Sequence, residues 1–187
     1  MSWKNLPNLI TIVRLVLVVP VVIFQMRGWY FAALLPFVVA GVSDGLDGFL
    51  AKRFNWVSRL GSLLDPLADK ILLISIMSVM TWQGFIPVWL LTLIIVRDLV
   101  ILTGAISYEF IFGHVEMAPS FPSKINTFCQ IILVIGILAS LTIWSDEKSF
   151  TRWLEYVAAL TTIYSGIAYV VVWSRLAIQR MESRRER

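Results

Sequence analysis

Six apolar runs, each near the length that a helix needs to cross a bilayer, constrain this chain more than any other feature. A helix of roughly 20 residues spans about 30 Å of hydrocarbon. The 187 residues are 58% hydrophobic and only 15% charged, and the mean hydropathy of +0.80 lies far outside the usual range for soluble domains. The runs occur at about residues 8–25, 29–50, 63–82, 85–111, 121–143 and 152–174. The sequence therefore predicts an all-α integral membrane bundle of six transmembrane helices, in a single domain over residues 1–187.

The positive charges predict how these helices are oriented. Threaded as six spans, ten of the sixteen Lys and Arg residues fall on one side and three on the other, with three more in or near the spans. Lys and Arg gather in cytoplasmic loops, so we expect a multi-pass protein with both termini in the cytoplasm, in the inner membrane if the source is bacterial. The net charge of +4 and the basic tail at 175–187 suit anionic lipid headgroups, and no recognisable module indicates nucleic-acid binding.

Four aspartates carry the strongest chemical signal, because Asp44, Asp47, Asp65 and Asp69 lie within 26 residues of an apolar chain. Their spacings, i, i+3 and i, i+4, place each pair on one face of a helix. A turn, a helix cap or an ion pair explains one or two such residues, but not four. Carboxylates gathered beside a bilayer need a positive partner. Without paired Cys or His ligands, this set favours Mg²⁺ or Mn²⁺ over zinc, on the cytoplasmic side of the membrane.

Two glycines accompany the aspartates. Gly48 follows Asp47 directly and Gly61 stands four residues before Asp65, where a phosphate group would need to approach the backbone closely. Seven residues at the right spacing resemble the signature of the CDP-alcohol phosphotransferase family, DxxDGxxAR, eight residues, then GxxxDxxxD: Asp44, Asp47, Gly48, Ala51, Gly61, Asp65 and Asp69. Lys52 replaces the arginine of that signature, which keeps the charge but not the planar bidentate fork.

This resemblance implies a homodimeric membrane enzyme with the CDP-alcohol phosphotransferase fold, which moves a phosphatidyl group from a CDP-linked lipid to an alcohol and releases CMP. By the same resemblance, Asp44, Asp47 and Asp65 hold two divalent ions. Asp69, also close to the metal, is implied to be the catalytic base for the acceptor hydroxyl. Two divalent ions against four carboxylates would leave a neutral platform for the pyrophosphate of the donor. The donor-binding residues that the signature implies are Asp47, Gly48, Ala51, Lys52 and Gly61.

The beginning of the chain adds a second match. Residues 5–14 resemble the NxPNxxTxxR start of phosphatidylglycerol-phosphate synthases and of CDP-alcohol-type cardiolipin synthases. Asn8, Thr11 and Arg14 share one helix face. They are either further donor-phosphate contacts or a helix cap and a structural ion pair, since a buried arginine needs a partner in both cases.

The acceptor side is predicted from Arg97, Asp98 and Lys124. Arg97 and Asp98 could form a purely structural pair, and Lys124 could be an interfacial lysine that extends toward water. Phosphatidylglycerol-phosphate synthases carry Arg-Glu and a further arginine one to two turns on, which suits the dianionic phosphate of glycerol 3-phosphate. This chain has Asp98 and, at the matching place, Ala105. The stretches 64–72, 86–87, 97–98 and 119–127 resemble cardiolipin synthases of the mitochondrial type instead.

The sequence therefore predicts cardiolipin and CMP formation from CDP-diacylglycerol and phosphatidylglycerol, with Arg97 and Lys124 on the acceptor. The alternative enzyme is a phosphatidylglycerol-phosphate synthase that uses glycerol 3-phosphate. A hypothesis from another class is a small cation transporter, in which the aspartates bind and release a permeating ion. Metal-dependent CMP release distinguishes either enzyme from the transporter.

Overall fold

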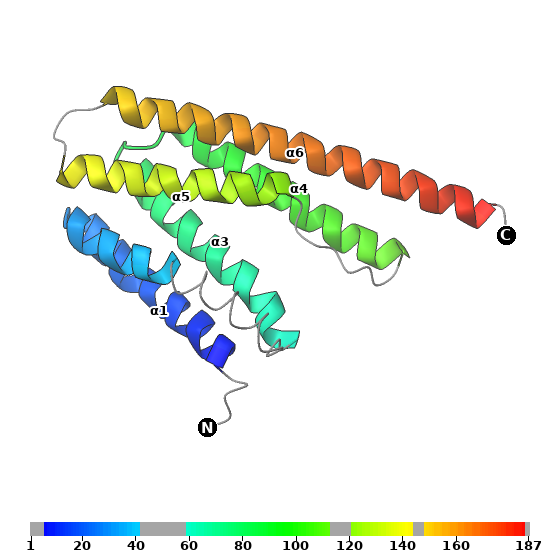
Figure 1. Ribbon diagram of the computed structural model, residues 1–187, viewed down its shortest axis with the longest axis horizontal. Coiled ribbons are helices and arrows are strands. Elements are labelled where there is room, and N and C mark those ends of the chain that lie inside the picture. Colours follow the sequence, from blue (N-terminus) through cyan, green and yellow to red (C-terminus); the bar gives the residue numbers. More distant parts are fainter. Residues whose placement is uncertain (1–5, 42–58, 113–120, 144–147, 186–187) are drawn as a thin grey trace. The chain divides into compact units, whose positions relative to one another are not determined.

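The computed structural model is all-α over the residues that it describes, 6–41, 59–112, 121–143 and 148–185, with side chains described for 12–41, 70–104, 107, 121–143 and 149–175. Figure 1 shows these helices along the chain. They are α1 (Leu6–Met26), a helical segment at Tyr30–Gly41, α3 (Arg59–Trp82), α4 (Val88–Phe112), α5 (Phe121–Thr142) and α6 (Lys148–Arg185).

Each of the six predicted apolar runs overlaps one of these helices, the second run being described as far as Gly41, so the prediction of an all-α chain is confirmed for the described residues. Two helical stretches, Phe121–Thr142 and Ser149–Arg175, are long and apolar enough to cross a membrane by length and composition. The shorter apolar helices described are Ile12–Met26, Tyr30–Gly41 and Lys70–Trp82. Pro122 lies in the first turn of α5, where a missing backbone N–H breaks no helical hydrogen bond.

Burial follows the pattern of a protein whose solvent is lipid. Large apolar side chains such as Val16, Phe31, Trp153 and Ile167 are exposed on the helices. Several polar side chains are buried instead: Arg14, Gln25, Arg97, Asn126, Gln130, Thr162 and Ser165. Polar groups in membrane helices face the protein interior because hydrocarbon leaves them unsatisfied.

The chain divides into two compact units, and the first comprises residues 1–86 and 134–147. Within it α1 packs along α3, and the buried side chains include Val21, Ile76, Met77 and Met80. The prediction of a single domain over the whole chain stays a prediction.

Two turns of this unit share one hydrogen-bond pattern. After α1, the N–H groups of Gly28 and Trp29 donate to Gln25 O at 3.0 Å and Phe24 O at 2.9 Å. After α3, Gly84 and Phe85 donate in the same way to Thr81 O at 3.1 Å and Met80 O at 2.9 Å. Both are Schellman motifs, which place a left-handed residue after the helix. Glycine fills that position twice, with φ of 75° at Gly28 and 81° at Gly84.

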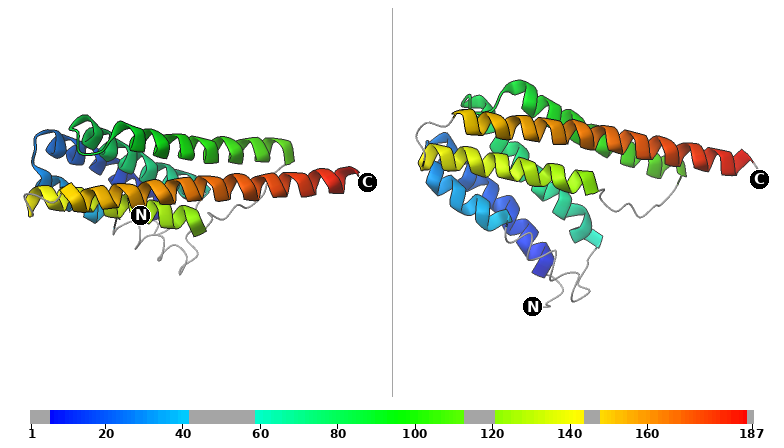
Figure 2. Two further views of the ribbon diagram at one scale, coloured as in Figure 1. Left: turned by 90° about the horizontal axis from the view of Figure 1, so that it is seen from above. Right: turned by 45° about the horizontal axis from the view of Figure 1, so that its top comes forward.

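The second unit comprises residues 87–133 and 148–187. Its helices α4 and α6 pack along each other, as the views in Figure 2 show. Glycine stands at two points of this contact, where an added Cβ would make an ordinary van der Waals contact. A Cβ at Gly166 would lie 3.5 Å from Arg97 Cγ, and one at Gly104 would lie 3.4 Å from Tyr169 Cε1. The Tyr169 hydroxyl donates to Ile101 O at 3.0 Å, which adds a polar link between the two helices.

Candidate active site

The predicted metal and donor residues all belong to the first unit. Asp44, Asp47, Gly48, Ala51 and Lys52 lie outside the described residues. Gly61, Asp65 and Asp69 occupy successive turns in the N-terminal half of α3. The helical spacing predicted for the second aspartate pair is therefore present in the backbone, while the convergence of four carboxylates stays a prediction.

The predicted donor residues at the start of the chain lie on the helix that packs on α3. Asn8 and Thr11 fall in the first two turns of α1, and Arg14 follows one turn later. The Arg14 side chain is buried, with 2% of its surface exposed. A charged group at this depth is expensive and is retained for pairing or for function, so Arg14 remains compatible with both roles that the sequence left open.

The donor set determines which metal these residues would fit. All four predicted ligands are carboxylates, which are the oxygen ligands that Mg²⁺ and Mn²⁺ prefer. Two of them, Asp65 and Asp69, stand four residues apart on α3. Among the described side chains, no three His, Cys, Asp or Glu residues gather in one place. The aspartate cluster lies outside that set, so the metal site remains a prediction.

Arg97 organises the second unit. Its Nη1 donates to Asp98 Oδ1 at 2.8 Å, in an ion pair whose two side chains are only 4% and 14% exposed. Its Nη2 donates to Ser123 Oγ at 2.9 Å on α5, and also to Ser165 Oγ on α6. One guanidinium thus holds three helices together. Its Nε is buried and has no hydrogen-bond partner among the residues that the structure describes.

A second polar layer lies one helical turn from Arg97. Asn126 Oδ1 lies 3.1 Å from Thr161 Oγ1 and 2.8 Å from Thr162 Oγ1. Each hydroxyl is also close to the carbonyl four residues earlier, at 2.9 Å for Thr161 and 2.6 Å for Thr162. A hydroxyl has one proton to donate, and amide orientation is an assignment that the network decides. If the Asn126 amide is turned so that its two N–H bonds donate to the threonine oxygens, both hydroxyl protons go to the carbonyls. The amide oxygen then takes the buried place where Nδ2 has no partner among the described residues.

These contacts bring Arg97 on α4 next to the start of α5, the stretch that contains Lys124. Lys124 is exposed, and it follows Ser123, which accepts a hydrogen bond from Arg97. The structural pair of Arg97 and Asp98 that the sequence left open is present, whereas contact with an acceptor stays a prediction. Sequence reasoning missed Ser165 as a partner of Arg97. The available signal was a charged pair inside an apolar span, which requires hydrogen-bonding groups on neighbouring helices.

Comparison with known sequences assigns the family. Residues 4–164 match the profile of the CDP-alcohol phosphatidyltransferase family. The chain belongs to this family, whose fold is a membrane fold, and the resemblance drawn from the aspartate signature is confirmed.

Individual relatives divide between two activities. The chain is 30% identical to the chloroplastic CDP-diacylglycerol–glycerol-3-phosphate 3-phosphatidyltransferase 1 of Oryza sativa, over 95% of this chain and 60% of that protein. It is 31% identical to the cardiolipin synthase (CMP-forming) of Rattus norvegicus, over 90% of this chain and 62% of that protein. It is 32% identical to the CDP-diacylglycerol–glycerol-3-phosphate 3-phosphatidyltransferase of Escherichia coli K12, over 89% of this chain and 93% of that protein. The chain thus spans less than two thirds of the rice and rat proteins but nearly all of the bacterial one.

Proposed function

We propose that this chain transfers a phosphatidyl group from CDP-diacylglycerol to phosphatidylglycerol, yielding cardiolipin and CMP. The family supports the CDP-linked donor, and relatives named cardiolipin synthase support the product at an identity similar to that of the other relatives. The choice of acceptor rests on Ala105, which stands where a phosphatidylglycerol-phosphate synthase has an arginine beyond its own Arg-Glu pair. Asp98 neutralises Arg97 at 2.8 Å, so that pair offers no surplus charge.

A neutralised guanidinium limits the charge that the acceptor can carry. With Arg97 paired to Asp98, the predicted acceptor side offers one further cation, the exposed Lys124. Ala105 stands where a phosphatidylglycerol-phosphate synthase has another arginine. A phosphodiester carries one negative charge, whereas the phosphate of glycerol 3-phosphate carries nearly two. The single remaining cation therefore suits phosphatidylglycerol better.

The chemistry is assigned to the aspartates of the signature. The acceptor hydroxyl oxygen forms a bond to the phosphatidyl phosphorus, and the bond from that phosphorus to the bridging oxygen of the pyrophosphate breaks, so that CMP leaves. Asp69 accepts the hydroxyl proton as general base. Asp44, Asp47, Asp65 and Asp69 would hold two divalent ions, which supply positive charge to the pyrophosphate when bound. Lys52 and Arg14 orient the donor phosphates.

A second candidate function has its own support. The rice and Escherichia coli relatives are named as transferases to glycerol 3-phosphate, so phosphatidylglycerol-phosphate synthesis is the alternative. It requires Arg97 and Lys124 to hold a dianion despite Asp98. The homodimer and the cytoplasmic orientation of the site are part of the proposal in both cases.

The decisive experiment offers both acceptors to one preparation. Purified protein in detergent receives CDP-diacylglycerol with phosphatidylglycerol, with glycerol 3-phosphate, or with both, and products are identified by mass. We expect cardiolipin and stoichiometric CMP, both abolished by a chelator and restored by Mg²⁺ or Mn²⁺. Phosphatidylglycerol phosphate as the sole product would overturn the choice of acceptor. Ion flux without CMP release would overturn the enzyme itself.

A further inference from the structure

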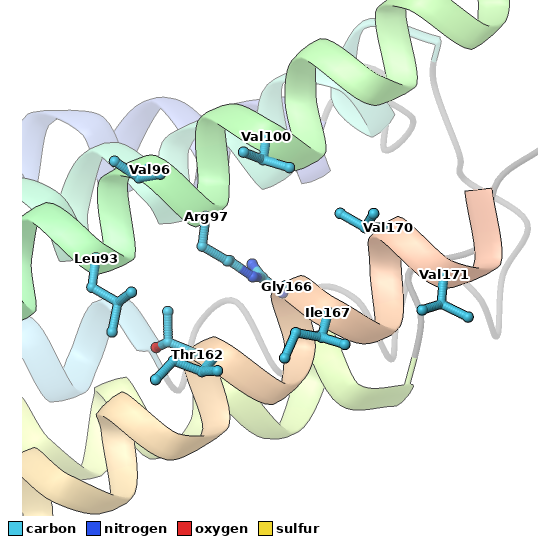
Figure 3. Close-up of a pocket in the computed structure, with 10 residues that line it drawn as sticks. Leu93, Val96, Arg97, Val100, Thr162, Gly166, Ile167, Val170 and Val171 are labelled. Atoms are coloured by element: carbon cyan, nitrogen blue, oxygen red, sulfur yellow. The ribbon is translucent and has the colours of Figure 1, made fainter. Parts of the chain in front are cut away.

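In the second unit a groove lies between α4 and α6, and Figure 3 shows the side chains that line it. Its volume is about 380 Å³, which falls within the range of small-molecule pockets. Aliphatic side chains from both helices make up most of its walls. They include Leu93, Val96 and Val100 on α4, and Ile163, Ile167 and Val170 on α6.

The groove is open to the surroundings of the helices. Val96, Ile167 and Val170 are 51%, 59% and 49% exposed. These surroundings are hydrocarbon, because Ser149–Arg175 is one of the stretches that is long and apolar enough to span a bilayer. A concave, aliphatic surface in that medium suits a flexible hydrocarbon chain.

Arg97 connects the groove to the acceptor side. Its side chain extends from α4 toward Gly166 on α6 (Figure 3), and its Cγ lies 3.5 Å from where a Cβ of Gly166 would be. The aliphatic part of Arg97 therefore forms part of the groove wall, while its Nη atoms donate hydrogen bonds to Asp98, Ser123 and Ser165. A lipid whose headgroup is bound beside Arg97 and Lys124 has this groove within reach of its chains.

The side chains argue against a second copy of the protein as the occupant. Membrane helices associate where small residues let the backbones approach. The groove has one glycine, Gly166, and the space beside it is filled by Arg97. The remaining walls consist mainly of branched aliphatic side chains, which hold a second helix away but pack well against an acyl chain.

We propose that this groove binds one acyl chain of the acceptor phosphatidylglycerol. This inference rests on the proposed function and extends it, because a soluble acceptor such as glycerol 3-phosphate has no hydrocarbon chain to place in the groove. Binding of the chain would add affinity for a lipid acceptor that does not depend on the charge of its headgroup. The groove would then contribute to the choice between the two acceptors together with Asp98.

Two matched substitutions on α6 test the proposal. Val170→Trp fills the groove, whereas Val172→Trp adds the same volume at a residue that is equally exposed, 50% against 49%, but does not line it. For Val170→Trp we expect the KM for long-chain phosphatidylglycerol to rise about tenfold, as for two methylene groups that lose their burial. The KM for CDP-diacylglycerol should stay unchanged, and a short-chain phosphatidylglycerol should be used as well as by the parent protein. Val172→Trp should leave all three values unchanged.

A binding measurement covers the case in which Val170→Trp folds poorly. Phosphatidylglycerol with a photoreactive group in one acyl chain should label peptides of α4 and α6 in the parent protein, and an excess of unlabelled phosphatidylglycerol should suppress the labelling. Equal kinetic effects of the two tryptophans, or a rise in the KM for CDP-diacylglycerol alone, would overturn the proposal. A change of oligomeric state with Val170→Trp alone would assign the groove to a second copy. If the parent protein makes only phosphatidylglycerol phosphate, the proposed function fails, whatever the labelling shows.

Discussion

Two sets of polar contacts, one in each unit, use their side chains in different ways. In the first, the Gln25 amide nitrogen lies 3.4 Å from Ile76 O, and the Gln83 amide donates to Gln25 O at 2.8 Å. Both contacts join a neutral side chain to a backbone carbonyl. In the second unit, Arg97 joins a carboxylate and two hydroxyls on three helices through side chains alone.

The difference separates structure from function. A neutral amide that satisfies a carbonyl near a helix end completes backbone hydrogen bonding, which hydrocarbon requires. A guanidinium among apolar helices has a high desolvation cost, and the hydrogen bonding of the backbone does not require such a group. We therefore expect substitutions at the glutamines to change stability alone, and substitutions around Arg97 to change both stability and the use of the acceptor.

We expect the largest effect in the first unit, at Asp69, which takes no part in the polar contacts compared above. Asp69→Asn keeps the size of the side chain but removes the general base, so turnover should fall by about 100-fold or more. The KM values and the helical circular dichroism should stay unchanged. Glu155→Gln on α6 is the matched control, since it removes a carboxylate away from the signature. Retained turnover of Asp69→Asn would remove this residue from the base role.

Arg97→Gln should have the next largest effect. It removes the guanidinium from an ion pair whose side chains are only 4% and 14% exposed, and breaking a buried pair in this way costs about 3–5 kcal/mol. We expect a lower melting temperature in detergent and a higher KM for the acceptor, with the KM for CDP-diacylglycerol unchanged. The exposed Arg152 supplies the control, Arg152→Gln. A melting temperature equal to that of the control would show that the Arg97 network carries no structural role.

Ser165→Ala sharpens the same test with a smaller change. It removes one hydroxyl that accepts from Arg97 and leaves the ion pair with Asp98 in place. Hydrogen bonds between membrane helices are worth about 0.6 kcal/mol on average and up to about 1.7, so the loss of stability should lie in that range. The acceptor KM should rise only modestly, because Ser123 still holds Nη2. An effect equal to that of Arg97→Gln would mean that Ser165 itself contacts the acceptor.

Gln83→Ala should have the smallest effect. It removes one neutral hydrogen bond to Gln25 O, which is worth about 0.5–1.5 kcal/mol, and it should leave both KM values and turnover unchanged. Thermal unfolding and the two-acceptor assay measure these quantities together. A raised acceptor KM would break the contrast between the units, because it would connect the turn after α3 to acceptor binding.

Local patterns predicted most of the helices, and tertiary contacts explain what they left out. Over the described residues each of the six apolar runs is helical, because the run length and the need to satisfy backbone groups in hydrocarbon agree. The extension of α6 to Arg185 was missed, since the apolar run ends near residue 174. Arg and Glu are good helix formers, so the helix continues beyond the apolar run.

In the candidate site, too, local contacts could be predicted from the sequence and contacts between distant residues could not. The pair of Arg97 and Asp98 is local and can be read from neighbouring residues. Ser123 and Ser165 could not be assigned as partners, because they lie 26 and 68 residues from Arg97 along the chain, and no local pattern states which helices will meet. The aspartate signature was recognised from spacing alone, and its convergence stays a prediction.

The separation of these partners has a consequence for how the protein is made. A ribosome delivers α4 to the membrane well before α6, so Ser165 does not yet exist when Arg97 first meets lipid. Asp98, the next residue, is synthesised with it and supplies a counter-charge from the start. The adjacent carboxylate thus lowers the free-energy cost of placing the Arg97 charge in lipid until α6 is inserted and Ser165 can accept its hydrogen bond.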